Sequence, residues 1–196
     1  MYKKLLITMT ILVSLTMGTT LKAASAKKKL QPQVTIWAVG EMLMPQDSDF
    51  SDLYGNSHFL PKAKLTLHFT PHIHIFAGYS FMKAEGNIQF MDLSFDMECK
   101  QSQITFGFGW TSPLSTKFDW YVEAGGFYVK QEENGMDDNM KESLFGFCAE
   151  TGLVFKLAKA LLAQVHAGYS QASKELATGT VKPGGITFGV GLGYRF

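Results

Sequence analysis

Glu123, Glu150 and His166 are the residues of this 196-residue sequence whose types and spacing could do chemistry together. Each stands at a polar position in a segment where apolar and polar residues alternate, so we expect each on the same face of a different β-strand. Two neighbouring carboxylates raise the pKa of at least one of them, and an imidazole would join them as a third titratable partner. Such a cluster could act as a proton-sensitive gate.

Asp119 and Arg195 add two more charges to this set. Arg195 is the sole arginine of the chain, and an estimate of depth along the strands gives Asp119 or Glu150 as its expected partner. A polar core of this kind can specify one strand register without any gating role, and we prefer that interpretation to a charged gate. The predicted lumen network consists of Asp119, Glu123, Glu150, His166 and Arg195.

Eight segments with apolar residues at every second position must hold these side chains. Period-two alternation is typical of strands in a sheet with two different faces. The segments cover residues 33–43, 63–70, 72–83, 95–110, 117–130, 142–156, 161–171 and 186–196. The first has apolar residues on both faces, which leaves the orientation of Trp37 and Glu41 open. The pattern predicts an all-β fold, an eight-stranded antiparallel up-and-down transmembrane barrel.

The connections between these segments alternate in length. Those at residues 44–62, 84–94, 131–141 and 172–184 are long and polar, whereas the other three are short turns. Transmembrane barrels have short periplasmic turns and longer outer loops, so we expect both chain ends on the periplasmic side. The first long connection contains Phe50, Tyr54 and Phe59, which suit either a binding surface or a flap over the barrel mouth.

The first 26 residues have the layout of a secretory signal peptide. Lys3 and Lys4 precede an apolar run that ends in the small residues Ala24, Ser25 and Ala26. We expect cleavage after Ala26, a barrel domain over residues 27–196 and export to the periplasm. Of the 18 Lys and Arg residues, 3 leave with the signal, so 15 remain against 17 Asp and Glu. This balance gives no electrostatic support for a nucleic-acid partner.

The final segment, FGVGLGYRF, carries Phe188, Tyr194 and Phe196 on one face. It resembles the C-terminal signature of the small eight-stranded outer-membrane barrels of Gram-negative bacteria, such as the OmpA transmembrane domain, OmpX and the opacity-type proteins. The resemblance implies that the barrel-assembly machinery recognises Phe188, Tyr194 and Phe196. It also implies a place in the cell outer membrane, among its lipids and lipopolysaccharide.

A resemblance of fold does not by itself supply an activity. We expect a structural or surface-interaction role through the long outer loops, with an unknown surface ligand. The alternatives are a narrow porin-like channel gated by the lumen charges, a lipid-modifying enzyme and a soluble periplasmic lipid-binding barrel. His166 and Ser170 are too far apart on one strand for a catalytic dyad, at about 13 Å, so we expect no enzyme.

No cofactor and no metal are expected. His68, His72 and His74 cluster around one short turn, but no thiolate or carboxylate accompanies them at ligand spacing, and solvated turn residues are the simpler interpretation. Cys99 and Cys148 fall on the fourth and sixth segments, which are not neighbours. The geometry required of a disulfide disfavours a bond between them but leaves it open.

Overall fold

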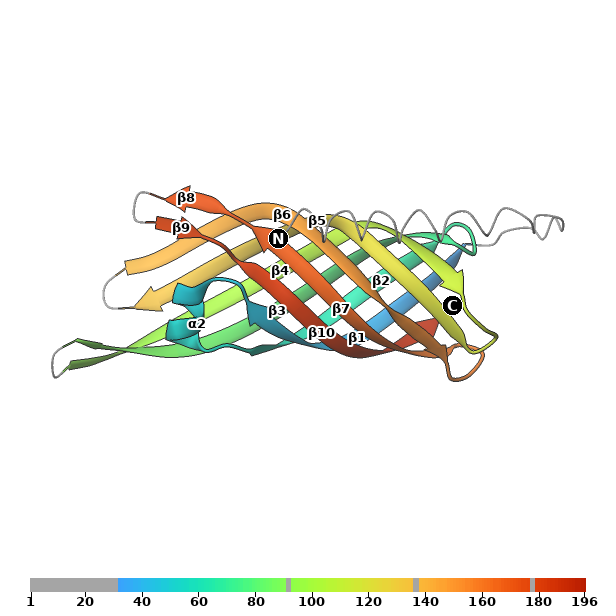
Figure 1. Ribbon diagram of the computed structural model, residues 1–196, viewed down its shortest axis with the longest axis horizontal. Coiled ribbons are helices and arrows are strands. Elements are labelled where there is room, and N and C mark those ends of the chain that lie inside the picture. Colours follow the sequence, from blue (N-terminus) through green and yellow to red (C-terminus); the bar gives the residue numbers. More distant parts are fainter. Residues whose placement is uncertain (1–31, 91–92, 136–137, 177–178) are drawn as a thin grey trace, which may run out of the picture. The chain divides into compact units, whose positions relative to one another are not determined.

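The computed structural model describes residues 32–90, 93–135, 138–176 and 179–196, so the expected signal peptide lies outside the described residues. Eight strands close into a barrel in the order β1-β10-β7-β6-β5-β4-β3-β2, and all neighbouring pairs are antiparallel (Figure 1). The strands are β1 (Gln33–Pro45), β2 (His58–His68), β3 (Ile73–Phe90), β4 (Leu93–Pro113), β5 (Phe118–Gly135), β6 (Asp138–Lys156), β7 (Leu161–Ala172) and β10 (Gly184–Arg195). The predicted eight-stranded antiparallel up-and-down barrel is confirmed.

Three smaller elements occupy the longer connections. Helix α2 (Ser48–Tyr54) lies between β1 and β2, and the two-stranded sheet of β8 (Lys174–Leu176) and β9 (Gly179–Val181) lies between β7 and β10. We call the end of the barrel that carries these elements the hairpin end. The opposite end, with the turns at residues 69–72, 114–117 and 157–160, is the turn end. In the described part of the chain, no helix is long and apolar enough to cross a membrane.

The strands are strongly staggered around the barrel. A circuit of the strand pairings that starts at Thr35 on β1 returns to β1 at Pro45, ten residues further along. Such a displacement requires tilted strands and sets the width of the barrel. With eight strands, the interior is just wide enough for side chains to fill it.

The outer face of the barrel is a belt of apolar side chains. Phe108 on β4 and Phe145 on β6 are 72% and 69% exposed, and similarly exposed apolar residues occur on all eight strands. Burying that much apolar surface in water-free surroundings is strongly favourable, whereas leaving it in water is not. This exterior is typical of a barrel surrounded by lipid and not of a soluble barrel.

The face of β1 that points into the lumen carries both apolar and polar side chains. Trp37 and Glu41 share one parity and are both buried in the lumen, at 5% and 4% exposure. The outward positions between them hold Ala38 and Gly40, which are small. Large apolar residues on the lumen side and small residues on the lipid side explain why the parity of this strand is ambiguous in the sequence.

The expected strand boundaries are wrong at the hairpin end. β2 already begins at His58, and the expected loops at 84–94 and 131–141 are mostly continuations of β3, β4, β5 and β6. Beyond the apolar belt both faces of a strand meet water, so the alternation fades although the hydrogen-bonded ladder continues. Charged cross-strand pairs replace the apolar ones there, including Lys83 with Glu98 at 2.6 Å.

Helix α2 covers part of the lumen at the hairpin end, where it contacts β1 and β3 and packs on Cys99 of β4. Asp47 caps the helix, since its Oδ1 accepts hydrogen bonds from the backbone N–H groups of Asp49 and Phe50. Tyr54 is buried against Cys99, and Phe50 packs on the same cluster as well as on a neighbouring cluster of Leu43, Leu60 and Met82. Of the three aromatic residues expected in a loop, Phe50 and Tyr54 therefore form the flap, while Phe59 faces outward on β2.

Cys99 and Cys148 are free and buried thiols. Cys99 lies under α2, beyond the apolar belt, and burial, together with the nearby Glu133, raises its pKa to about 12. In a Cys148→Ser background, we expect Cys99 to react with a thiolate-specific disulfide reagent at a rate that still rises about tenfold per pH unit from pH 8 to 10. An exposed thiol would level off above its ordinary pKa of about 8.5.

The control for this prediction is Tyr54→Ala, which removes the aromatic ring that covers Cys99. Its thiol is expected to react at least tenfold faster at pH 8 and to level off at lower pH. A fast reaction of Cys99 in the intact protein, with a plateau near pH 9, would show that α2 does not cover this thiol.

Candidate functional site

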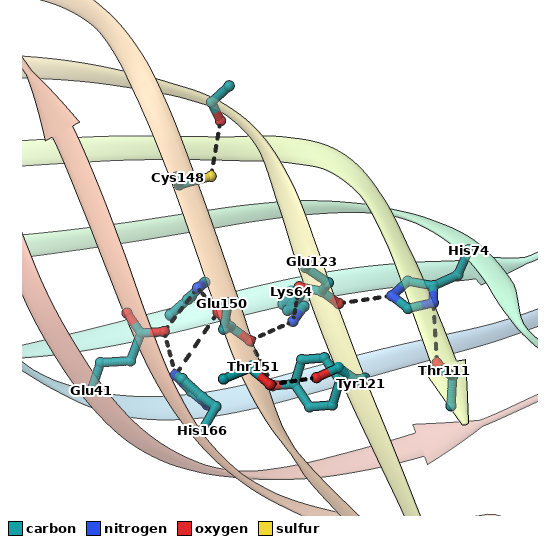
Figure 2. Close-up of polar contacts among 12 residues, drawn as sticks. Glu41, Lys64, His74, Thr111, Tyr121, Glu123, Cys148, Glu150, Thr151 and His166 are labelled. Atoms are coloured by element: carbon teal, nitrogen blue, oxygen red, sulfur yellow. Dashed lines mark hydrogen bonds and ion pairs between the residues drawn. The ribbon is translucent and has the colours of Figure 1, made fainter. Parts of the chain in front are cut away.

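Seven ionisable side chains form a continuous line across the middle of the lumen, which we call the charge chain. Figure 2 shows this line running from the pair of Glu41 and His166 to His74 on the opposite wall. Six strands contribute, with two residues from β2. In order along the line, the charge chain consists of His166, Glu41, Lys62, Glu150, Lys64, Glu123 and His74.

The centre of the charge chain is Glu150. Its two oxygens accept hydrogen bonds from Lys62 Nζ at 3.1 Å and from Lys64 Nζ at 2.8 Å. A third donor, the Tyr121 hydroxyl, lies 2.6 Å from Glu150 Oε1. Charge-assisted hydrogen bonds of this length are the strong ones in proteins, so Glu150 ties three strands together across the lumen.

The two lysines connect Glu150 to the outer carboxylates. Lys62 Nζ lies 2.8 Å from Glu41 Oε1, and Lys64 Nζ lies 2.6 Å from Glu123 Oε2. The Lys64 ammonium also lies 5.0 Å from the centre of the Tyr121 ring, within the range of a cation–π contact. Each lysine is therefore shared between two carboxylates.

Each end of the charge chain is a histidine bound to a glutamate. His166 Nε2 lies 2.9 Å from Glu41 Oε1, and His74 Nε2 lies 3.0 Å from Glu123 Oε1. The second ring nitrogen of His74 pairs with the Thr111 hydroxyl at 3.3 Å. Within the described residues, Nδ1 of His166 has no hydrogen-bond partner. Each imidazole is therefore held by a glutamate through one ring nitrogen.

Glycines on neighbouring strands make room for the two histidine rings. A Cβ atom at Gly109 would collide with His74 and lie 2.7 Å from Glu123 Cγ. A Cβ atom at Gly189 would in the same way collide with His166 and lie 2.9 Å from a carbon of Glu41. The absence of a side chain at these two glycines leaves space for the histidines at the ends of the charge chain. This requirement explains part of the glycine richness of the lumen face.

The charge chain carries three carboxylates against two ammonium groups. Taking such groups out of water costs several kcal/mol for each ion, and close opposite charges must offset that penalty. An alternating line satisfies this requirement, because every carboxylate touches a lysine and no two like charges are adjacent along it. Protonation of one histidine would bring the formal charge of the line to zero.

The lumen space on both sides of the charge chain is small. The cavity towards the hairpin end has about 30 Å³ and is lined by Ser80, Gln103, Phe127 and Ser170, among others. The cavity towards the turn end has about 20 Å³. A single water needs roughly 10–15 Å³, so each cavity holds only one to three waters. The paired side chains of the charge chain lie between these two cavities.

A divalent cation bound by Glu41, Glu150 and His166 would have to compete with the ammonium group of Lys62. One ligand atom from each of Glu41, Glu150 and His166 lies within 4.8 Å of the others, which is a spacing suited to a metal ion. However, Lys62 Nζ already sits 2.8 and 3.1 Å from the two carboxylates. The lysine ammonium therefore supplies the positive charge that a metal would bring.

The residues of the predicted lumen network separate into two groups. Glu123, Glu150 and His166 all belong to the charge chain. Asp119 and Arg195 lie nearer to the turn end, where Asp119 pairs with Lys156 at 2.6 Å. Arg195 has Asp119 near enough to attract it but donates its Nε–H to the Thr35 hydroxyl at 3.5 Å. The expected ion pair from Arg195 to Asp119 or Glu150 is therefore not formed.

The three histidines near the first short turn do not form one cluster. His68 and His74 face each other inside the barrel, with ring centres 4.8 Å apart. His72 lies at the turn, where its Nδ1 is 2.9 Å from the Thr111 carbonyl and its ring stacks on Trp110. The side chains point to different surroundings, and His74 is engaged by Glu123.

Sequence reasoning missed Glu41, Lys62, Lys64 and His74. The expected segments place the two lysines at the end of a loop and the start of a strand, and the alternation does not decide the parity of Glu41. A signal was present in the stretch FLPKAKLTLH, where Phe59, Ala63 and Leu65 alternate with the lysines. Extending the period-two pattern back to His58 would have placed both ammonium groups in the lumen.

Comparisons with solved structures identify the architecture. OprG from Pseudomonas aeruginosa matches with a TM-score of 0.56 and 14% identity, over 84% of this chain and 95% of that chain. Ail of Yersinia pestis matches with a TM-score of 0.52 and 14% identity, over 84% and 98% of the two chains. The N-terminal barrel domain of OprF from P. aeruginosa matches with a TM-score of 0.51 and 15% identity, over 85% of this chain and 100% of that chain.

The sequence comparisons were negative, because no protein-family model and no curated protein matches the chain. At sequence identities near 15%, the structural matches support only the assignment of the fold. The closed order of the strands, their antiparallel pairing and the apolar outer belt agree with those matches. The chain therefore has the fold of the small eight-stranded outer-membrane β-barrels.

Proposed function

We propose that this chain is a resident of the outer membrane whose closed barrel is a rigid scaffold and whose hairpin end is a surface for interaction. The observation that carries this proposal is the charge chain, which fills the lumen from wall to wall with paired side chains. A filled lumen leaves the hairpin end as the part of the molecule with freedom to bind. Enzymatic activity is not part of the proposal.

Apolar layers on both sides of the charge chain support a closed lumen. On β5, Phe127 and Val129 follow Glu123 towards the hairpin end and pack in one buried cluster with Leu144. On the side of the turn end, Trp37 and Val154 belong to a second buried cluster. Ions crossing the barrel would have to open both layers as well as the charge chain.

The hairpin end offers polar groups outside the apolar belt. Lys83 and Lys100 both pair with Glu98 on the outer face of β3 and β4, and hydrogen bonds from Lys100 and Lys83 lower the pKa of Glu98 to about 2. Lys130 and Lys141 similarly pair with Glu132. This charged band would lie at the level of lipopolysaccharide headgroups. Ail, which has the same fold, was crystallised in complex with the heparin analogue sucrose octasulfate, so a barrel of this fold can bind a ligand.

The proposed location and orientation can be tested with single cysteines in a background without Cys99 and Cys148. Lys141→Cys places a thiol at the hairpin end, where the Lys141 side chain is 61% exposed. Lys159→Cys is the matched control in an exposed turn at the turn end. In intact cells, a membrane-impermeant maleimide is expected to label only Lys141→Cys, and Lys159→Cys should react after the outer membrane is permeabilised. Equal labelling of both in intact cells would contradict the proposal.

A narrow channel gated by the charge chain is the second candidate function. The two small cavities are the observation that favours a channel, because only the ion pairs of the charge chain separate them. Conductance of the refolded protein in a planar bilayer distinguishes the two functions. We expect a silent barrel, whereas discrete openings that become more frequent in Glu150→Ala would favour the channel. Folding is checked by the resistance of the unheated band to SDS.

In this proposal, the last strand is the part of the chain that the barrel-assembly machinery recognises. Phe188, Tyr194 and Phe196 all point outward and are at least half exposed. Tyr194 and Phe196 stack edge to face at 4.9 Å. An outward aromatic edge of this kind is available to the barrel-assembly machinery before the strand meets lipid.

A further inference from the structure

The cavity at the turn end is bounded on one side by Lys64, Glu123 and His74 of the charge chain, and the rest of its wall has other polar groups. Its volume is about 20 Å³, and its wall includes Trp37, Thr66, His68, Gln164 and Arg195. Arg195 and His68 at its rim are half-buried, while Thr66 and Gln164 are 4% and 2% exposed. The cavity is therefore a polar recess that begins at the turn end and stops at the charge chain.

Two buried polar groups in this wall have no partner. Within the described residues, Nε2 of Gln164 and Oγ1 of Thr66 form no hydrogen bond. Buried polar atoms are nearly always hydrogen-bonded, because an unmet donor or acceptor loses its contact with water and gains nothing in return. An occupant of the cavity is the only available partner, and it must accept a hydrogen bond from the Gln164 amide.

The charges of the wall leave one cation without a close carboxylate. Asp119 is paired with Lys156 at 2.6 Å, and Glu123 is held by Lys64 at 2.6 Å. Arg195 makes no ion pair within the described residues, and its Nε contact to Thr35, at 3.5 Å, is long. A guanidinium has five N–H donors, so most of its capacity remains for an occupant.

The wall of this cavity collects donors from neighbouring strands. β7, β10, β1 and β2 are consecutive around the barrel, and Thr35 on β1 pairs with Arg195 on one side and with Thr66 on the other. Gln164 comes from β7, where it pairs with Gly191, four residues before Arg195 on β10, and it lines the same cavity. One stretch of wall thus presents a guanidinium, an amide and a hydroxyl.

We propose that this cavity binds a small free anion, such as inorganic phosphate or a simple carboxylate, with Arg195 as its charge partner and Gln164 and Thr66 as hydrogen-bond partners. Water could satisfy the amide and the hydroxyl, but only an anion would add negative charge beside the guanidinium, because its neighbour Asp119 is already paired with Lys156. The volume accommodates one or two oxygen-sized groups, so the anion is small or enters with only one end. The proposal does not depend on what the hairpin end binds.

Trp37 provides a reporter in the wall of the cavity. In a Trp110→Phe and Trp120→Phe background, Trp37 is the one tryptophan that remains. Iodide is a small anion that quenches tryptophan, so its titration into the refolded barrel reports occupancy. We expect quenching that saturates and that inorganic phosphate or acetate reverses. Acrylamide, which is neutral, and caesium ions, which are cationic, are expected to give weaker and linear quenching.

Arg195→Gln is the central variant, with an expected loss of about tenfold in apparent iodide affinity, since a charge-assisted contact is removed. Arg195 belongs to the last strand, so Thr66→Val and Gln164→Leu supply variants on other strands, and each should weaken the phosphate competition severalfold. Lys117→Gln, which alters an exposed lysine outside the cavity wall, is the matched control and should leave the titration unchanged. Linear iodide quenching that phosphate leaves unaltered, or an identical saturating curve in all three wall variants, would overturn the proposal.

Discussion

Lys64→Met is expected to lower the free energy of unfolding of the barrel by about 3–5 kcal/mol. The Lys64 side chain is 2% exposed and lies between Glu123 and Glu150, at 2.6 and 2.8 Å. Methionine keeps the length of the side chain but removes its charge, so two buried carboxylates lose a shared counter-ion. Unfolding in urea from lipid vesicles, followed by tryptophan fluorescence, measures the change.

The control is Lys83→Met, which removes an equally well paired lysine at the hairpin end. Its side chain is 50% exposed and contacts Glu85 and Glu98. Exposed ion pairs contribute little, because water and salt screen them, and the urea midpoint should stay where it is. If both variants had the same midpoint as the parent, the charge chain would have no role in stability.

Phe127→Ala is expected to have an effect of similar size for a different reason. Phe127 is 0% exposed and packs against Phe76, Val129 and Leu144 on the hairpin side of the charge chain. Truncating a buried phenylalanine removes its transfer free energy and leaves a cavity, at a total of about 3–5 kcal/mol. The same urea titration would detect the loss, and the slope should be unchanged if the unfolded state is unaffected.

Phe108→Ala is the matched control for Phe127→Ala. Phe108 belongs to the neighbouring strand β4, but it points outward and is 72% exposed. Lipid chains can fill the space that the ring leaves, so no empty cavity remains and the loss should be clearly smaller. Equal losses in the two variants would mean that the lumen is not packed as tightly as the buried cluster indicates.

The sequence was sufficient for the architecture and for three of the seven members of the charge chain. Glu123, Glu150 and His166 stand at polar positions between large apolar residues, so the period-two pattern fixed their side of the sheet. Their order along three consecutive strands also gave a comparable depth. These features follow from local alternation, and the sequence contains that information directly.

The side of Glu41, the partner of Arg195 and the pairings within the charge chain depended on information that local alternation does not carry. Glu41 shares its face with Trp37 and Val39, so polarity could not distinguish the two faces of β1. The partner of Arg195 depended on the stagger of the strands, which is a property of the closed barrel. Pairings such as Glu41 with His166, 125 residues apart, cannot be read from sequence spacing.

The closing pair of strands has a consequence for the kinetics of folding. β1 and β10, the first and last strands of the barrel, pair only when every intervening strand is in place. The charge chain draws on strands from β1 to β7, so its lysines can find all their carboxylates only late in that process. The ion pairs should therefore be absent from the rate-limiting transition state, and weakening them should speed unfolding more than it slows folding. The ion pairs in the middle of the lumen would then form last during folding and break first during unfolding.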